Sequence, residues 1–270
     1  MYLTVNGHKT YCYTGGKAFD AARPTVVFIH GVLNDHSVWS LQTRYFANHG
    51  WNVLAADLPG HCKSEGEPPE SVEDAAKFVI GLLDAAGVRQ AALVGHSFGS
   101  LTVLEAAASS PERVSHLALV GTAFPMKVSP ALLDGSLNAP MKAIDMVNTY
   151  SHATLAPPPS SAGPGTWLYG GGRALMRRVL ASNPRVNLFH RGFKACDDYR
   201  GGDEAIAKVK CPVLFLLAKS DSMTLPRMAQ TLQARSPGAK TVLVEAGHQM
   251  MEEAPDEVLF ALTDFLGIKT

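Results

Sequence analysis

Short apolar runs alternate with longer amphipathic stretches along most of the chain. Six of these runs are rich in Val and Leu and show little alternation between apolar and polar positions. This pattern is typical of strands in a parallel sheet whose two faces are both covered. The six predicted strands are residues 25–29, 52–56, 91–94, 114–120, 212–218 and 240–244. Two extended segments precede Gly15, and the Asn6-Gly7 pair between them predicts a hairpin, so we expect an antiparallel edge.

The amphipathic stretches between the runs predict helices. The stretch from Ser71 to Ala86 has an N-cap residue at Ser71, acidic residues in its first turn and Gly87 as its stop. A last helix is predicted to begin at Pro255, with its apolar positions facing the core. Alternation of strands with helices predicts an α/β fold with helices on both faces of the sheet.

One long segment, residues 124–203, contains no strand pattern. It holds short amphipathic pieces separated by turn sequences such as Pro157-Pro158-Pro159 and Gly170-Gly171-Gly172. Because structureless loops of this length are uncommon in compact domains, we expect an inserted helical cap here. The predicted core then comprises residues 1–123 and 204–270.

Composition narrows the class of protein. Hydrophobic residues make up 46% of the 270 residues and charged residues 18%, which provides for a large buried core and excludes a disordered chain. The formal net charge is zero and no basic stripe is present, so nucleic acid and anionic membrane surfaces are not expected partners. The apolar runs are too short to span a bilayer, and the first residues lack the pattern of a signal peptide.

The four cysteines are scattered, without a CxxC pair or the spacing of metal ligands. We therefore expect free thiols in a cytoplasmic protein and no metal site. The expected partner is a small-molecule substrate, and the expected state is a monomer or homodimer.

Candidate chemistry begins with Gly95-His96-Ser97-Phe98-Gly99, which lies between a predicted strand and a predicted helix. A serine on so sharp a turn takes strained backbone angles and needs small neighbours two positions away, which Gly95 and Gly99 supply. The motif alone is weak, but this context predicts that Ser97 is a nucleophile.

A serine hydroxyl needs a base, and a histidine base needs a carboxylate that fixes its tautomer. Asp221 and His248 each follow a predicted strand, in the order that this topology requires. Asp57 also ends a strand but precedes the serine, so we expect a structural role for it. Acyl transfer further needs two backbone N–H donors for the oxyanion. Phe98 supplies one, and Val32, in the turn after residues 25–29, is the expected second.

Several alternatives to Asp221 and His248 fit less well. The loop after Val120 offers no carboxylate, which removes the usual competing position for the acid. Other candidates for the acid lie in the predicted cap and not at a strand end; they are Asp134 and Asp145. Other candidates for the base lie in turns or in the cap; they are His36, His61, His152 and His190. His30 and His96 adjoin functional turns, where a histidine more often forms structural hydrogen bonds.

Together these motifs resemble the α/β-hydrolase fold family. The resemblance runs from about Gly7 to Leu266 and is carried by His30-Gly31, Asp57-Leu58-Pro59-Gly60-His61, the serine motif, the Asp221 loop and Gly247-His248. It implies an eight-stranded, mostly parallel sheet, a cap inserted after the sixth strand and no cofactor. One departure is visible: Cys62 stands where relatives usually have glycine, so that turn is expected to differ.

The resemblance to serine members of the family favours a carboxylesterase-like hydrolase for small to medium, mostly apolar esters. A carbon–carbon hydrolase of ring-fission products, a thioesterase, or an acyltransferase or perhydrolase would use the same triad. A ligand-sensing protein with slow turnover is a further alternative. Apolar or adaptable residues beside these loops or in the cap are candidates for the substrate pocket. They are Gly31, Trp39, Met126, Met141, Trp167, Leu225, Gln249 and Met250.

Overall fold

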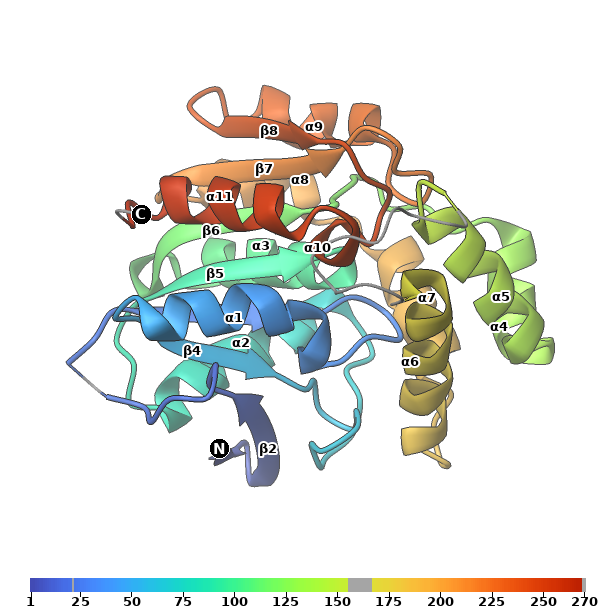
Figure 1. The fold of residues 1–270 in the computed structure, drawn as a ribbon, viewed down its shortest axis with the longest axis horizontal. Coiled ribbons are helices and arrows are strands. Elements are labelled where there is room, and N and C mark those ends of the chain that lie inside the picture. The colour runs from blue at the N-terminus through green and yellow to red at the C-terminus, as the bar shows by residue number, and fades with distance from the viewer. Residues whose placement is uncertain (21, 155–166, 269–270) are drawn as a thin grey trace.

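The computed structural model describes residues 1–20, 22–154 and 167–268, which form an eight-stranded sheet with helices on both faces (Figure 1). The strands lie in the order β1-β2-β4-β3-β5-β6-β7-β8. The first two pairs, β1 with β2 and β2 with β4, are antiparallel, and all other pairs are parallel. The strands are β1 (Tyr2–Val5), β2 (His8–Tyr13), β3 (Thr25–Ile29), β4 (Asn52–Ala56), β5 (Ala91–His96), β6 (Val114–Val120), β7 (Val213–Ala218) and β8 (Lys240–Val244).

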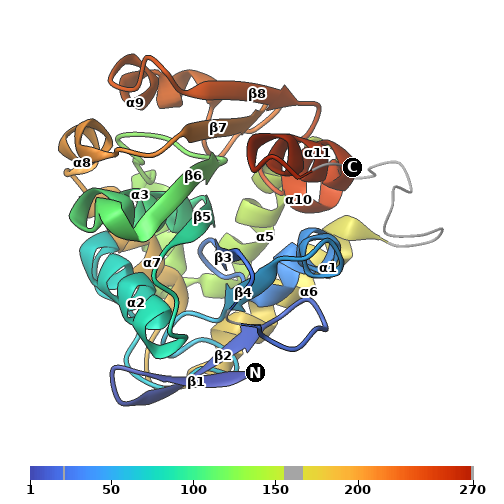
Figure 2. The same ribbon diagram turned by 90° about the vertical axis from the view of Figure 1, so that its left-hand side faces the viewer.

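The predicted fold class is confirmed, including the antiparallel edge. Asn6 and Gly7 connect β1 to β2 with φ angles of 49° and 82°, the left-handed conformation that the Asn-Gly turn favours. Figure 2 shows this hairpin at one edge of the twisted sheet and β8 at the other.

Two apolar clusters cover the two faces of the sheet. Val27 and Ile29 of β3 belong to one cluster, and Val26 and Phe28 of the same strand belong to the other. Since successive side chains of a strand point to opposite faces, both sets must be apolar, which is why the sequence shows no alternation here.

The helices on one face are α2 (Val72–Ala85), α3 (Phe98–Ser109), α8 (Gly202–Lys208) and α9 (Gln230–Ala234). On the other face lie α1 (Ser40–Asn48), α10 (Met250–Glu253) and α11 (Pro255–Phe265). The Ser71 side chain accepts a hydrogen bond from the N–H of Asp74, so it is the N-cap of α2.

Four helices between β6 and β7 lie beyond the carboxyl ends of the parallel strands (Figure 1). They are α4 (Pro130–Asn138), α5 (Pro140–Ser151), α6 (Leu168–Ser182) and α7 (Leu188–Asp198). All four fall within the predicted cap of residues 124–203, whereas α8 already packs against α3. Whether this segment is a separate domain stays a prediction. Among the described residues, no helix is long and apolar enough to cross a membrane.

Candidate active site

Ser97 occupies a tight turn between β5 and α3. Its φ of 54° and ψ of −120° are strained for a residue with a side chain. Close approach explains the glycines on either side. A Cβ at Gly95 would lie 2.1 Å from the carbonyl oxygen of Gly99, and a Cβ at Gly99 would lie 2.4 Å from the carbonyl oxygen of Ile29. The turn therefore requires glycine at both positions.

Asp221 and His248, which follow β7 and β8, form a buried hydrogen-bonded pair. Nδ1 of His248 lies 2.8 Å from Oδ2 of Asp221, and the two side chains are 7% and 1% exposed. The other carboxylate oxygen, Oδ1, accepts hydrogen bonds from the N–H groups of Met223 and Thr224, at 2.8 and 2.7 Å. The pair is thus held in one orientation, with Nε2 of the imidazole left for other chemistry.

The environment of Asp221 keeps it ionised. Burial alone would raise the pKa of this carboxyl. The facing imidazole of His248 and the hydrogen bonds from His248 and Thr224 outweigh that effect, so the pKa lies below its ordinary value. A carboxylate that stays charged can stabilise an imidazolium beside it.

His96, the residue before Ser97, also contacts His248. Its Nε2–H donates a hydrogen bond of 2.9 Å to the carbonyl oxygen of His248, and the two ring centroids are 4.5 Å apart. Burial lowers the pKa of His96 to about 3, with the nearby His248 adding to the effect. His96 is therefore neutral at physiological pH and acts as a structural support.

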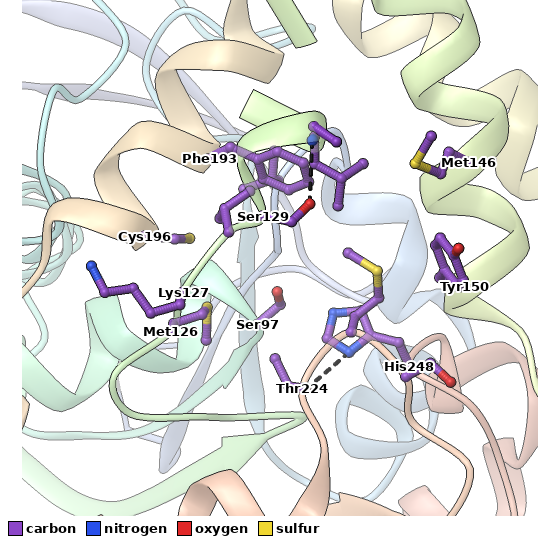
Figure 3. A pocket seen from close by; sticks show the side chains of 16 residues that line it. Ser97, Met126, Lys127, Ser129, Met146, Tyr150, Phe193, Cys196, Thr224 and His248 are labelled. Carbon is purple, nitrogen blue, oxygen red and sulfur yellow. Dashed lines mark hydrogen bonds between the residues drawn. The ribbon is translucent and has the colours of Figure 1, made fainter. Parts of the chain in front are cut away.

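Ser97 and His248 border the same cavity, which has a volume of about 520 Å³. Figure 3 shows the Ser97 side chain next to the imidazole of His248, with Thr224 below them and the side chains of α5 across the cavity. The lining also includes Val32, Met126, Lys127, Val128, Ser129, Ala131, Leu132, Met146, Tyr150, Phe193, Cys196, Ser222 and Met223.

The backbone segments that carry the two expected oxyanion donors lie next to Ser97. Phe98 is the first residue of α3, so its N–H has no acceptor inside the helix. The turn after β3 passes close to the serine, because a Cβ at Gly31 would lie 3.0 Å from the Cβ of Ser97. Val32 follows in this turn and borders the cavity. Both backbone segments therefore come close to Ser97.

Among the eight residues predicted for the substrate pocket, Met126 borders the cavity. Trp39 and Met250 are fully buried in the core, and Trp39 packs on Phe28 with ring centroids 5.1 Å apart. Met141 and Trp167 point to the surface, with 42% and 62% of their areas exposed.

The remaining three predicted pocket residues also lie outside the lining. Gly31 lies beside Ser97 in the turn after β3. Gln249 is buried, and its N–H donates to the carbonyl oxygen of Ser151. Leu225 lies just before Pro226 and is partly buried.

Sequence reasoning missed most of the cavity lining. Met146 and Tyr150 are four residues apart on α5, so they share one face of that helix, and this spacing is a signal that was present in the sequence. The segment from Lys127 to Leu132 follows Met126 directly, but no pattern within it indicates which side chains turn inward.

Asp57, the competing acid, is paired with His36. Its Oδ1 lies 2.7 Å from Nδ1 of His36 and accepts from the N–H of that residue at 3.0 Å. Ligand atoms of Asp35, His36 and Asp57 lie within 4.8 Å of one another. However, Asp35 is already paired with Arg178 at 2.6 Å, and the ring of His36 is paired with Asp57. Asp35, His36 and Asp57 therefore already have protein partners, and we assign no metal to this cluster.

Cys62, the departure from the family pattern, has a φ of 46°. Burial, with the nearby Asp35 and Asp57, raises the pKa of its thiol to about 12. A thiol in this state is a weak nucleophile.

Comparison with known proteins agrees with the fold. A family model described as alpha/beta hydrolase fold matches residues 24–150. The crystal structure of the enol-lactonase from Burkholderia xenovorans superposes with a TM-score of 0.82 and 23% identity, covering 99% of this chain and 100% of that chain. A thermophilic esterase superposes with a TM-score of 0.79 and 25% identity, covering 99% of this chain and 96% of that chain.

Curated protein sequences similar to this chain also include hydrolases. The uncharacterized hydrolase YugF of Bacillus subtilis is 27% identical over 90% of both chains. A 2-hydroxy-6-oxononadienedioate/2-hydroxy-6-oxononatrienedioate hydrolase of Paraburkholderia phymatum is 36% identical, over 43% of this chain and 42% of that protein. Other relatives at 30% identity or more are likewise matched over less than half of their length, between 19% and 38%. From its sheet, its serine turn and these likenesses, the chain has the α/β-hydrolase fold.

Proposed function

We propose that this protein hydrolyses carboxylic esters of small to medium, mostly apolar acids or alcohols, with Ser97 as its nucleophile. The observation that carries the proposal is the buried Asp221–His248 pair, whose imidazole borders the same cavity as a serine on a strained turn. A serine, a histidine and a carboxylate so placed are the groups that acyl transfer needs.

In this mechanism His248 takes the proton of the Ser97 hydroxyl through Nε2 as the oxygen attacks the ester carbonyl. The N–H groups of Val32 and Phe98 donate to the oxyanion that develops. His248, as an imidazolium oriented and stabilised by Asp221, then gives its proton to the leaving alcohol. A water molecule deprotonated by His248 attacks the acyl-enzyme and releases the acid, which restores the hydroxyl of Ser97.

The cavity favours an uncharged substrate. Its lining contains no carboxylate among the described residues, and its lysine is engaged elsewhere. Nζ of Lys127 lies 3.1 Å from the carbonyl oxygen and 3.6 Å from a carboxylate oxygen of Asp197. Methionines, Leu132 and Phe193 supply apolar contact area on the walls.

A second candidate is cleavage of a carbon–carbon bond in a ring-fission product, because the Paraburkholderia relative is named for dioate substrates. Such substrates carry two carboxylates, and a cavity whose one lysine already faces Asp197 gives these charges little compensation. Ester hydrolysis therefore has more support. The four cysteines are free thiols, which agrees with the cytoplasmic location that we propose.

The test is a panel of p-nitrophenyl esters from acetyl to decanoyl, with matched acyl thioesters and vinylogous ketones. We expect steady turnover of esters and stoichiometric labelling of Ser97 by a fluorophosphonate. The same panel with Ser97→Ala is the control for background hydrolysis. A marked preference for the ketones would replace the ester assignment, and labelling without turnover would indicate a ligand sensor.

A further inference from the structure

The loop that carries His248 is attached to the C-terminal end of α5. The N–H of Gln249, next to the histidine, donates a hydrogen bond of 3.0 Å to the carbonyl oxygen of Ser151. Ser151 is the last residue of α5, one of the four helices that lie beyond the carboxyl ends of the strands. One backbone bond thus joins the two segments directly.

Glu253 makes a second, stronger connection between the same segments. Its Oε1 accepts a hydrogen bond of 2.9 Å from the N–H of Ala153, just after α5. Its Oε2 accepts one of 2.6 Å from the N–H of Gly247, just before His248. Each oxygen of the carboxylate serves one segment, and hydrogen bonds to an ionised acceptor are stronger than those between neutral groups.

The two segments cross in very close contact. A Cβ at Gly247 would lie 2.5 Å from the backbone nitrogen of Ala153 and 2.8 Å from the carbonyl carbon of His152. Both atoms belong to backbone, so no flexible side chain could move aside. Glycine at position 247 therefore allows the approach that Glu253 then holds.

Helix α5 also forms a wall of the substrate cavity. Met146 and Tyr150 line the cavity from this helix, facing Ser97 and His248 across it (Figure 3). The same short stretch of chain, from Met146 to Ala153, thus contacts the substrate space at one end and the histidine loop at the other.

We propose that Glu253 is a positioning residue that ties α5 to the His248 loop, so that the wall of the cavity and the general base keep one fixed relative placement. The inference rests on the proposed role of His248 in ester hydrolysis. Glu253 contacts neither substrate nor imidazole in this scheme; it acts through the backbone of Gly247 and Ala153.

The test compares Glu253→Gln with Glu257→Gln, which removes the same charge from an exposed position on the following helix. The first measurement is backbone hydrogen exchange by mass spectrometry of peptides that cover residues 151–154 and 246–249. A Gln side chain has one acceptor oxygen instead of two, so we expect faster exchange in both peptides for Glu253→Gln and in neither for Glu257→Gln.

The second measurement is the kinetics of p-nitrophenyl butyrate hydrolysis. We expect kcat of Glu253→Gln to fall about 10- to 100-fold, since a displacement of about 1 Å at a reacting group costs on the order of 10²-fold. Gly247→Ala, which forces the segments apart while keeping Glu253, should lower kcat in the same way. Circular dichroism and thermal unfolding establish that each variant is folded at the assay temperature.

Unchanged exchange in both peptides of Glu253→Gln would overturn the proposed connection. Faster exchange with unchanged kcat in a folded variant would overturn the positioning role while leaving the contact intact. If the wild-type protein cleaves no ester, the proposed function fails, and the exchange measurement still decides whether Glu253 connects the two segments.

Discussion

The hydroxyl of Thr224 donates a hydrogen bond of 2.8 Å to Oδ2 of Asp221, the oxygen that also faces His248. The same hydroxyl oxygen lies 3.2 Å from Nδ1 of His248 and 3.0 Å from the carbonyl oxygen of Gly121. Thr224 therefore touches both members of the buried pair and fixes the carboxylate between the strand ends.

Replacement of this hydroxyl tests its contribution. Thr224→Val keeps the shape of the side chain but removes a hydrogen bond to a charged acceptor, worth about 1.5–3 kcal/mol. We expect kcat/KM for p-nitrophenyl butyrate to fall about 10-fold or more, because the carboxylate that orients His248 loses one of its hydrogen-bond donors. Thr224→Ser retains the hydroxyl and should stay near wild type. Equal losses in both variants would mean that the methyl group matters instead.

Two substitutions of Ser97 separate the loss of its hydroxyl from the relief of its backbone strain. Ser97→Ala and Ser97→Gly should each lower kcat by several orders of magnitude, because both lack the hydroxyl. Only glycine relieves the backbone conformation at φ 54° and ψ −120°, which costs on the order of 1–3 kcal/mol for other residues. We therefore expect the free energy of unfolding of Ser97→Gly to exceed that of Ser97→Ala by about 1 kcal/mol, after the entropy cost of glycine. Urea unfolding measures the difference, and the opposite order would show that the turn is unstrained.

The assignment of the acid predicts a ranking. Asp221→Asn should lower kcat by roughly 10³- to 10⁴-fold, because the amide no longer stabilises the required tautomer and charge of His248. Asp57→Asn should have a smaller effect on kcat and a larger one on stability, since Asp57 is fully buried and bonds to His36. Both variants are assayed at matched folded fraction, and a reversed ranking in kcat would transfer the role to Asp57.

Glu252 predicts a dependence of stability on pH. Burial, together with the charge of Glu253, raises the pKa of its carboxyl to about 7 in the folded protein. The unfolded chain releases this proton near the ordinary value of 4.5, so the folded state loses stability as pH rises between about 4.5 and 7. Glu252→Gln should therefore raise Tm at pH 8 but have little effect at pH 4. A shift of equal size at both pH values, with Glu257→Gln as control, would contradict this assignment.

The position of Met146 at the border of the cavity predicts how long an acyl chain the protein accepts. Met146 borders the cavity and is 41% exposed, whereas Met141, on the same helix, is 42% exposed and lies outside the lining. Met146→Trp should lower kcat/KM for p-nitrophenyl octanoate by about 10-fold relative to the acetate, because the larger side chain fills part of the apolar pocket and a misfit there lowers kcat/KM by roughly this factor. The free energy of unfolding should stay nearly unchanged. Met141→Trp should leave the ratio of octanoate to acetate turnover as it is. A similar change from both substitutions would place the acyl chain elsewhere.

Local sequence explains how much of the fold could be predicted. Strand β3 is apolar on both faces because two clusters cover it, and α2 begins at Ser71 because its side chain caps the helix. Such signals lie within a few residues of the feature that they predict. The strained turn at Ser97 leads directly into α3, so this helix begins at Phe98, inside the serine motif itself.

Pocket residues depend on packing between distant segments, which no local pattern records. Trp39 and Met146 are both large and apolar, yet Trp39 fills the core and Met146 borders the cavity. The difference arises from the way α5 lies over the ends of the strands. The Glu253 contacts likewise join positions 100 residues apart, so the sequence alone gave no reason to single out that glutamate.

Strands β6 and β7 are neighbours in the sheet, although helices α4 to α8 intervene between them in the chain. The polypeptide therefore leaves the sheet and comes back at adjacent positions. A segment with its two ends side by side can gain, lose or exchange helices during evolution while the order of the strands is preserved. Changes in the helices that border the cavity therefore require no change in the serine turn, which lies in a separate part of the chain.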